Sequence, residues 1–94
     1  MNFNKKEKYE TEIEAPASDF AETRGWMQCK IMKLSKRAWP DRLFIRRGRV
    51  IFIEFKRPGE EPTQQQLYRH NQIRAHGVEV FWTDNLERAK EILI

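Results

Sequence analysis

The strongest hydrophobic pattern in the chain is the run VIFIEF at residues 50–55. A near-continuous apolar run of this length predicts a central strand that is covered on both faces. A shorter apolar run at residues 43–45 precedes it, and Arg47-Gly48-Arg49 separates the two. Gly48 can adopt a positive φ at little cost, which favours a tight turn between the runs. Residues 40–56 are therefore predicted to form an antiparallel β-hairpin.

Before the hairpin, residues 7–24 have the periodicity of an amphipathic helix. The apolar positions of this segment recur at helical spacing and lie on one face: Ile13, Ala17, Phe20 and Ala21. Pro16 disturbs the prediction, because a proline inside a helix removes a hydrogen bond and costs about 3 kcal/mol. Two alternatives stay open. The helix kinks at Pro16, or it begins near Ala15 with the proline in its first turn.

Between this helix and the hairpin, the pattern predicts a strand and then a loop. Residues 26–31 alternate between apolar and polar positions, as in a half-buried strand, and Cys29 is expected to lie in the core. Residues 32–39 are rich in basic side chains and are expected to lead as a loop into the hairpin. Trp39 in this loop has two open interpretations: it stacks on a nucleic-acid base, or it packs into the core.

After the hairpin, the pattern predicts a helix, a strand and a last helix. Thr63 with Gln66 three residues later is a capping-box sequence, and it predicts a helix that ends at Gly77. An apolar run at residues 78–82 then predicts a strand. This strand is expected to lie parallel to the long hairpin strand, because a right-handed helical crossover joins them. Residues 86–93 predict the last helix.

The resulting order is α-β-β-β-α-β-α in a single domain that spans residues 1–94. This order predicts an α/β fold, with a mixed central sheet flanked by helices on both faces. The formal net charge of +4 modestly favours a polyanionic partner. A lone cysteine excludes a disulfide framework within the chain. The chain shows neither a membrane-spanning apolar run nor a signal-peptide core, so we expect a cytoplasmic protein.

Three ionisable residues stand at one end of the predicted hairpin. Asp41 begins the first strand, and Glu54 and Lys56 end the second, where alternation places both on one face. Two carboxylates so close repel each other unless a cation neutralises them, and Mg²⁺ prefers one or two carboxylates plus waters and phosphate oxygens. A neighbouring lysine can orient an attacking water or stabilise charge on a phosphate. These parts suit phosphodiester hydrolysis.

The same residues resemble a known signature. Pro40-Asp41 followed by Glu54-Phe55-Lys56 resembles the PD-(D/E)xK nuclease motif, and residues 48–59 are similar to the VRR-NUC (virus-type replication-repair nuclease) family within that superfamily. Thr63-x-x-Gln66 adds to the resemblance, which covers nearly the whole chain. It implies a restriction-endonuclease-like core and a DNA endonuclease that depends on Mg²⁺ or Mn²⁺.

The resemblance also implies roles for particular residues. The implied metal-binding set comprises three carboxylates and one backbone carbonyl: Glu10, Asp41, Glu54 and Phe55. Glu12 is the second choice for the acid from the first helix. Lys56 would position the nucleophilic water, and Gln66 would support Lys56 or the phosphate.

Structural alternatives remain open for each of these residues. Glu54 and Lys56 could form an edge-strand salt bridge, and Asp41 could cap a turn after Pro40. Glu10 could belong to a solvated acidic helix start, and Gln66 could serve capping alone. The two histidines of this helix, His70 and His76, are expected at its surface rather than as metal ligands, with an inward position as the open alternative for His70.

Substrate and assembly follow from the same resemblance. Free-standing members of the family resemble Holliday junction resolvases, which implies branched DNA as substrate. One small domain has one active site, so symmetric cutting of two strands leads us to expect a homodimer. The expected location is the bacterial cytoplasm, which for a phage protein is the cytoplasm of its host. The pairing surface could come from Trp26, Met27, Phe81 or Trp82. The alternatives are a non-catalytic nucleic-acid-binding module and a nuclease subunit of a larger replication or repair assembly.

Overall fold

The computed structural model describes residues 5–32 and 38–94, with side chains described from Glu12 onward. The elements follow the predicted order, α-β-β-β-α-β-α. Their bounds are α1 Lys5–Thr23, β1 Met27–Lys30, β2 Arg42–Arg46, β3 Arg49–Phe55, α2 Gln64–Ala75, β4 Glu79–Thr83 and α3 Leu86–Leu93. Within this described part, none of the helices is both long enough and apolar enough to cross a bilayer.

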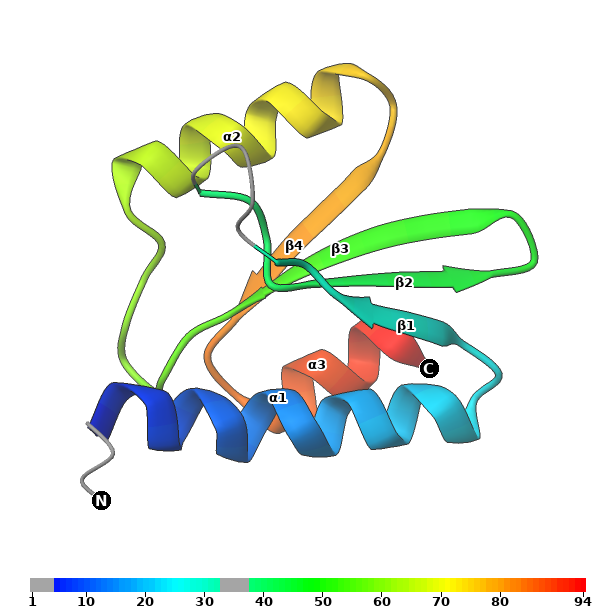
Figure 1. Ribbon diagram of the computed structural model, residues 1–94, viewed down its shortest axis with the longest axis horizontal. Coiled ribbons are helices and arrows are strands. Elements are labelled where there is room, and N and C mark those ends of the chain that lie inside the picture. The colour runs from blue at the N-terminus through cyan, green and yellow to red at the C-terminus, as the bar shows by residue number, and fades with distance from the viewer. Residues whose placement is uncertain (1–4, 33–37) are drawn as a thin grey trace.

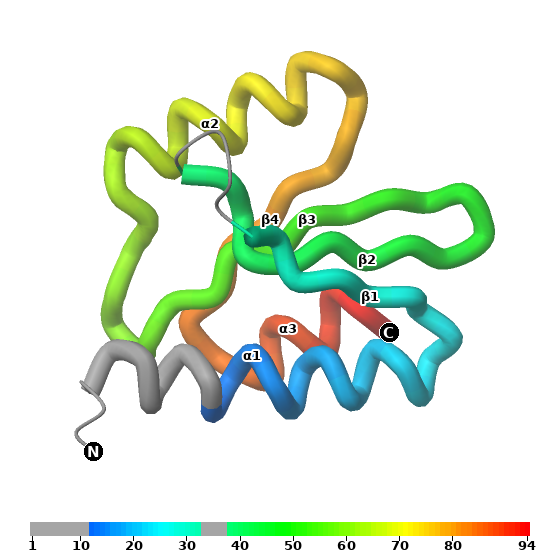
Figure 2. The backbone as a smooth tube through the Cα atoms, in the orientation of Figure 1, coloured from blue at the N-terminus to red at the C-terminus, as the bar shows by residue number. Residues whose placement is uncertain are grey.

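The strands form one mixed sheet in the order β1-β2-β3-β4. β1, β2 and β3 pair antiparallel, whereas β4 runs parallel to β3, as its helical crossover requires. Helices α1 and α3 lie together against one face of the sheet, and α2 packs over β4 on the other face (Figure 1). Figure 2 shows the β2–β3 hairpin extending away from α2 toward its turn.

The hydrophobic core lies between the sheet and the pair α1 and α3. Its members are the buried apolar side chains that these elements turn toward one another: Ile13, Ala17, Ala21, Trp26, Phe44, Ile51, Ile53, Phe55, Ala89 and Leu93. In β3 the residues Ile51, Ile53 and Phe55 enter this core, so alternation turns Phe52 and Glu54 toward the face that carries α2. One strand therefore contributes both to the main core and to the opposite face.

The hairpin turn has the backbone that the sequence predicts. Arg47 (φ 50°) and Gly48 (φ 81°) both have positive φ, as a two-residue hairpin turn with right-handed twist requires. The register then pairs Arg46 with Arg49 and continues to Arg42 opposite Ile53. The turn thereby fixes which residues meet at the far end of the hairpin.

Two details differ from the sequence predictions. Helix α1 runs unbroken through Pro16, so the alternative in which it begins near Ala15 is wrong. Burial of its apolar stripe offsets the hydrogen bond that the proline removes. Cys29 is exposed rather than buried in the core. Gln28 and Lys30, on the other face of β1, are the residues that contact α1.

Candidate functional site

The candidate site lies where the hairpin strands end. The last register pair of β2 and β3 is Arg42 with Ile53, so Asp41 and Glu54 follow at the next position, one on each chain segment. The Oδ2 atom of Asp41 accepts a hydrogen bond of 2.7 Å from the backbone N–H of Phe55. Its backbone carbonyl accepts another, of 2.8 Å, from the N–H of Ile31. These bonds fix Asp41 beside the end of β3, as the sequence predicts.

Glu54 is a buried carboxylate, with only 3% of the residue exposed. Helix α2 supplies two contacts to it. The Nε2 atom of Gln66 donates to Oε2 at 3.5 Å, and the Nε2 atom of His70 lies 3.4 Å from Oε1. A buried carboxylate is costly unless it is hydrogen-bonded or paired, and α2 provides that compensation.

Asp41 and Glu54 are close enough to affect each other's charge. The pKa of Asp41 is raised from 3.8 to about 7, mainly by burial and next by the nearby charge of Glu54, whereas the N–H of Phe55 partly opposes the shift. At neutral pH this carboxyl group is therefore poised to hold either a proton or a cation. A pair of this kind is not explained by a simple turn cap at Asp41.

His70 belongs to the site, although the sequence analysis placed it at the helix surface. The residue is fully buried, so that expectation is wrong. The pKa of His70 is lowered from 6.5 to about 4, mainly by burial and also by the charges of Arg74 and Lys56, and Asp41 partly opposes this shift. The imidazole is therefore neutral at pH 7, and its Nε2–H can donate to Glu54. The signal for His70 was its position four residues after Gln66, on the same helical face.

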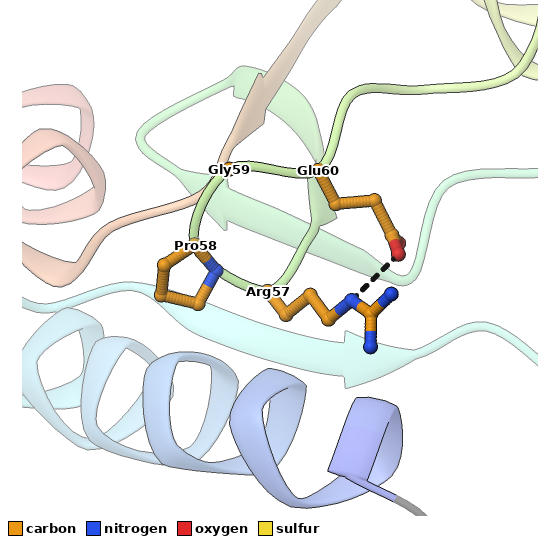
Figure 3. A pocket seen from close by; sticks show the side chains of 4 residues that line it. All are labelled: Arg57, Pro58, Gly59 and Glu60. Atoms are coloured by element: carbon orange, nitrogen blue, oxygen red, sulfur yellow. Dashed lines mark ion pairs between the residues drawn. The ribbon is translucent and has the colours of Figure 1, made fainter.

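Lys56 is nearly as buried as Glu54, with 3% of the residue exposed. Its Nζ atom lies 3.8 Å from Oε1 of Glu60. The other carboxylate oxygen of Glu60 accepts from Nε of Arg57 at 2.9 Å (Figure 3). Glu60 thus holds the lysine's charge near the end of β3, a role that the sequence analysis did not predict.

The loop that carries Glu60 is itself anchored. The N–H of Gly59 donates to Oδ2 of Asp84 at 2.9 Å, and the backbone N–H of Lys56 donates to the carbonyl of Thr83 at 2.8 Å. Residues 57–60 surround a small open hollow on the surface (Figure 3). The loop after β3 is therefore tied to β4, which keeps Glu60 within reach of Lys56.

The α1 side of the site is occupied by Glu14. This residue is 7% exposed, and its Oε2 lies 2.7 Å from both Nζ of Lys30 and Nε of Arg42. Its charge also contributes to the raised pKa of Asp41. Glu10 lies one helical turn earlier, on the same face, but its side chain falls outside the described residues. Glu12, the second choice, is exposed.

The described carboxylates match a hard divalent cation in type and number. Among the side chains from Glu12 onward, apart from those of residues 33–37, no three of His, Cys, Asp and Glu are grouped closely enough to hold a metal ion. Asp41 and Glu54 supply two carboxylates, which is what Mg²⁺ commonly takes from a protein. The third acid that the resemblance implies, Glu10, has its side chain outside the described residues.

Comparisons with known proteins agree with this geometry. No protein-family model matches the sequence. The chain is 39% identical over 62 residues to "Putative nuclease p44" of Acyrthosiphon pisum secondary endosymbiont phage 1, an alignment that covers 65% of this chain and 67% of that protein. It also shares the fold of a solved structure described as a VRR_NUC domain, with a TM-score of 0.81 and 24% identity, over 89% of this chain and 92% of the other. The chain therefore belongs to the same family as this phage protein and has the fold of a VRR_NUC domain.

Proposed function

We propose that the chain is a metal-dependent nuclease that hydrolyses phosphodiester bonds in DNA. The observation that carries the proposal is the pair Asp41 and Glu54, which lie together at the end of the hairpin and give Asp41 a raised pKa. The buried Lys56 follows directly after the strand that carries Glu54. The phage relative named as a nuclease and the VRR-NUC fold support it. A carboxylate pair and a lysine beside it are the groups that this hydrolysis requires.

The cation is proposed to be Mg²⁺ or Mn²⁺, one or two per site. Its ligands would be Asp41, Glu54, the carbonyl of Phe55 and Glu10. Such an ion, when bound, lowers the pKa of a coordinated water and stabilises charge on the phosphate. The raised pKa of Asp41 fits this assignment, because a cation removes the repulsion between the two carboxylates.

The protein's own groups position the reactants. Lys56, held by Glu60, would orient the attacking water and contact the scissile phosphate. Gln66 and His70 hold the carboxylate of Glu54 by its two oxygens. In the proposed reaction the water oxygen forms a bond to phosphorus, the bond to the 3′ oxygen breaks, and the products are a 5′-phosphate and a 3′-hydroxyl.

The test replaces Glu54 by glutamine, which keeps the side chain's shape and removes its charge. We expect loss of Mg²⁺-dependent cutting of supercoiled plasmid and labelled oligonucleotides by at least 100-fold, with folding checked by circular dichroism. Glu79→Gln is the matched control, because Glu79 is an exposed strand carboxylate that pairs only with Arg49 in the described structure. Undiminished cutting by folded Glu54→Gln would reject the proposal, as would cutting by the wild type that is equal with Mg²⁺ and with EDTA.

Branched DNA is the proposed substrate, and a homodimer the proposed assembly. A single chain carries one such site, and symmetric cutting of two strands needs two copies. Cleavage of labelled linear, flap and four-way substrates by the purified chain tests the preference. Equal rates on all of them would reject a structure-specific role while leaving the nuclease assignment intact.

A further inference from the structure

A second hollow lies between Trp39, which leads into the hairpin, and helix α2. It has a volume of about 240 Å³. Its lining combines one aromatic, one aliphatic and three polar side chains: Trp39, Arg69, Gln72, Ile73 and His76. None of these residues takes part in the proposed hydrolysis.

The indole of Trp39 forms a fixed wall of this hollow. Its ring packs against the ring of Phe52 with centroids 5.9 Å apart and planes at 57°. Trp39 nevertheless stays half-buried and borders the hollow. The sequence left open whether Trp39 packs into the core or stacks on a base. In the structure it packs against the sheet and still presents surface to a ligand.

Polar groups on α2 border the same space and are held in place. The guanidinium of Arg69 lies 5.8 Å from the centre of the Trp39 ring, and its NH1 donates to Oε1 of Gln72 at 2.8 Å. Such groups can hydrogen-bond to the edge of a planar heterocycle. A free phosphate would match the arginine but not the wall formed by Trp39 and Ile73, so the lining favours a planar, polar ring over a simple anion.

The hollow adjoins the carboxylates through both of its walls. Trp39 is two residues before Asp41, and Phe52 beneath it is two residues before Glu54 on the same face of β3. On α2, Arg69 directly precedes His70, whose imidazole contacts Glu54. A nucleotide whose phosphate lies at the carboxylates would therefore have its base within reach of the hollow.

We propose that this hollow binds an unpaired nucleobase next to the scissile phosphate. The proposal rests on the nuclease function proposed above and specifies its substrate class: DNA with an unstacked nucleotide at the cut, as in single strands, flaps and branch points. A base inside a continuous duplex is stacked and paired, and it cannot enter without being flipped out. Stacking on an aromatic side chain depends little on base identity, so the site would select structure rather than sequence.

The experiment is an abasic scan of a cleavable single-stranded oligonucleotide. At one position next to the cut, removal of the base should raise KM or weaken binding by about 10- to 100-fold, the range of one base-stacking contact. Trp39→Ala should weaken the intact substrate by a similar factor and be insensitive to the abasic position, whereas Trp39→Phe should keep most of the effect. Tyr68→Ala is the matched control. Tyr68 is an aromatic residue of α2, is 65% exposed and does not line the hollow.

Binding of the same oligonucleotides in Ca²⁺, followed by fluorescence anisotropy, separates the two proposals. Base-dependent binding without any cleavage in Mg²⁺ would support the base site and reject the nuclease function. Cleavage with no sensitive position in the wild-type scan would overturn the base site alone. The base site is also overturned if Trp39→Ala weakens binding of the intact and the abasic substrates equally. The wild-type scan decides even if Trp39→Ala does not fold.

Discussion

At the scale of single residues, the candidate site is a cluster of costly buried groups that stabilise one another only in part. Asp41 and Glu54 are acids in a poorly solvated place, and the neutral His70 and the amide of Gln66 are the donors that α2 directs at Glu54. Such an arrangement is unfavourable for an empty fold and favourable for a bound cation. The stability of the metal-free protein should reveal this.

The first prediction concerns pH and Asp41. Its folded-state pKa, about 7, lies above its ordinary value of 3.8, so its contribution to stability is complete below pH 4 and is lost as pH rises through 7. In EDTA, the wild type should lose on the order of 3 kcal/mol more unfolding free energy between pH 5 and pH 8 than Asp41→Asn does. Chemical denaturation at the two pH values measures this.

Mg²⁺ provides the complementary arm of that experiment. Saturating Mg²⁺ at pH 8 should restore the loss in the wild type, by about 2.7 kcal/mol at 100 times the dissociation constant, and should do little for Asp41→Asn. Identical pH profiles for the two proteins, or no stabilisation by the ion, would contradict the assignment of Asp41 as a metal ligand.

The second prediction concerns His70, which we assign as a positioning residue for Glu54. His70→Gln should raise the Mg²⁺ concentration needed for half-maximal cutting by about 10- to 100-fold, the usual cost of losing a group that orients a metal ligand. His70→Asn, whose shorter amide cannot reach as far, should be at least as impaired. Titration of activity against Mg²⁺ measures the effect, because a purely structural role would lower stability without moving this midpoint.

Gln65→Ala is the control for both variants, because Gln65 is an exposed residue of the same helix and does not line the base-binding hollow. It should leave the Mg²⁺ midpoint unchanged. If His70→Gln lowers stability but cuts with an unaltered Mg²⁺ midpoint, His70 fills space and does not orient Glu54.

Residue roles were only partly readable from the sequence. Strand alternation and the hairpin turn placed Asp41 and Glu54 together, and the structure brings them together. His70 shares a helical face with Leu67 and Ile73, which made it a possible inward residue, but helical spacing does not say which polar side chain of that face meets Glu54. Glu60 was missed because no periodicity predicts which side chain a loop turns inward.

At the scale of elements, α2 is tied to the site through its own N-terminus. The side chain of Thr63 accepts from the N–H of Gln66, and Oε1 of Gln66 accepts from the N–H of Thr63. The same amide uses its Nε2 to reach Glu54. One side chain therefore both begins the helix and contacts the carboxylate of Glu54, so its role is not capping alone, and its support of Lys56 or of a phosphate stays a prediction.

The third prediction separates these two roles. Thr63→Ala removes the cap and should cost about 1 kcal/mol of unfolding free energy while leaving kcat within a few-fold of normal. Gln66→Glu keeps an acceptor for the capping box but replaces the amide donor by a carboxylate facing Glu54. It should lower cutting at least tenfold with a smaller loss of stability. If the variant with the larger loss of unfolding free energy is also the variant that cuts more slowly, Gln66 serves capping alone.

Element boundaries were predictable where local chemistry sets them, at the capping box and the hairpin turn. The path of α1 was not, because the cost of Pro16 competes with burial of Ile13, Ala17 and Ala21, which depends on the sheet beneath them. The exposure of Cys29 likewise depends on which face of β1 receives a helix. Periodicity gives the two faces of a strand but does not say which one is covered.

At the scale of the whole molecule, the sheet has one face that the described helices cover unevenly. Helix α2 packs over β4, whereas a cross-strand row formed by Met27, Ile45 and Val50 lies on the same face over β1, β2 and β3. Met27 is 70% exposed and Ile45 36% exposed. Trp26, also considered as a pairing surface, is buried at 3% exposure and donates to the carbonyl of Leu93, so it is excluded.

The fourth prediction places the contact between two copies on this row. A two-fold dimer uses one self-complementary patch on both subunits, and an apolar row across one face of the sheet can meet its own copy. Met27→Lys should convert the dimer to a monomer in sedimentation experiments, because a like charge would be buried at the axis. The lysine also avoids repelling DNA, so nicking of plasmid should persist.

The two-strand model adds a kinetic signature to that change. The monomeric variant should cut a four-way junction one strand at a time, with independent rates, whereas the proposed wild-type dimer should cut both strands within one encounter. Met32→Lys is the matched control, since Met32 is 67% exposed but lies outside the row, and it should remain dimeric. Pairing would be ruled out as the basis of two-strand cutting if the wild type sediments as a monomer at working concentrations and still resolves junctions symmetrically. The proposed chemistry at each separate site would be unaffected by that result.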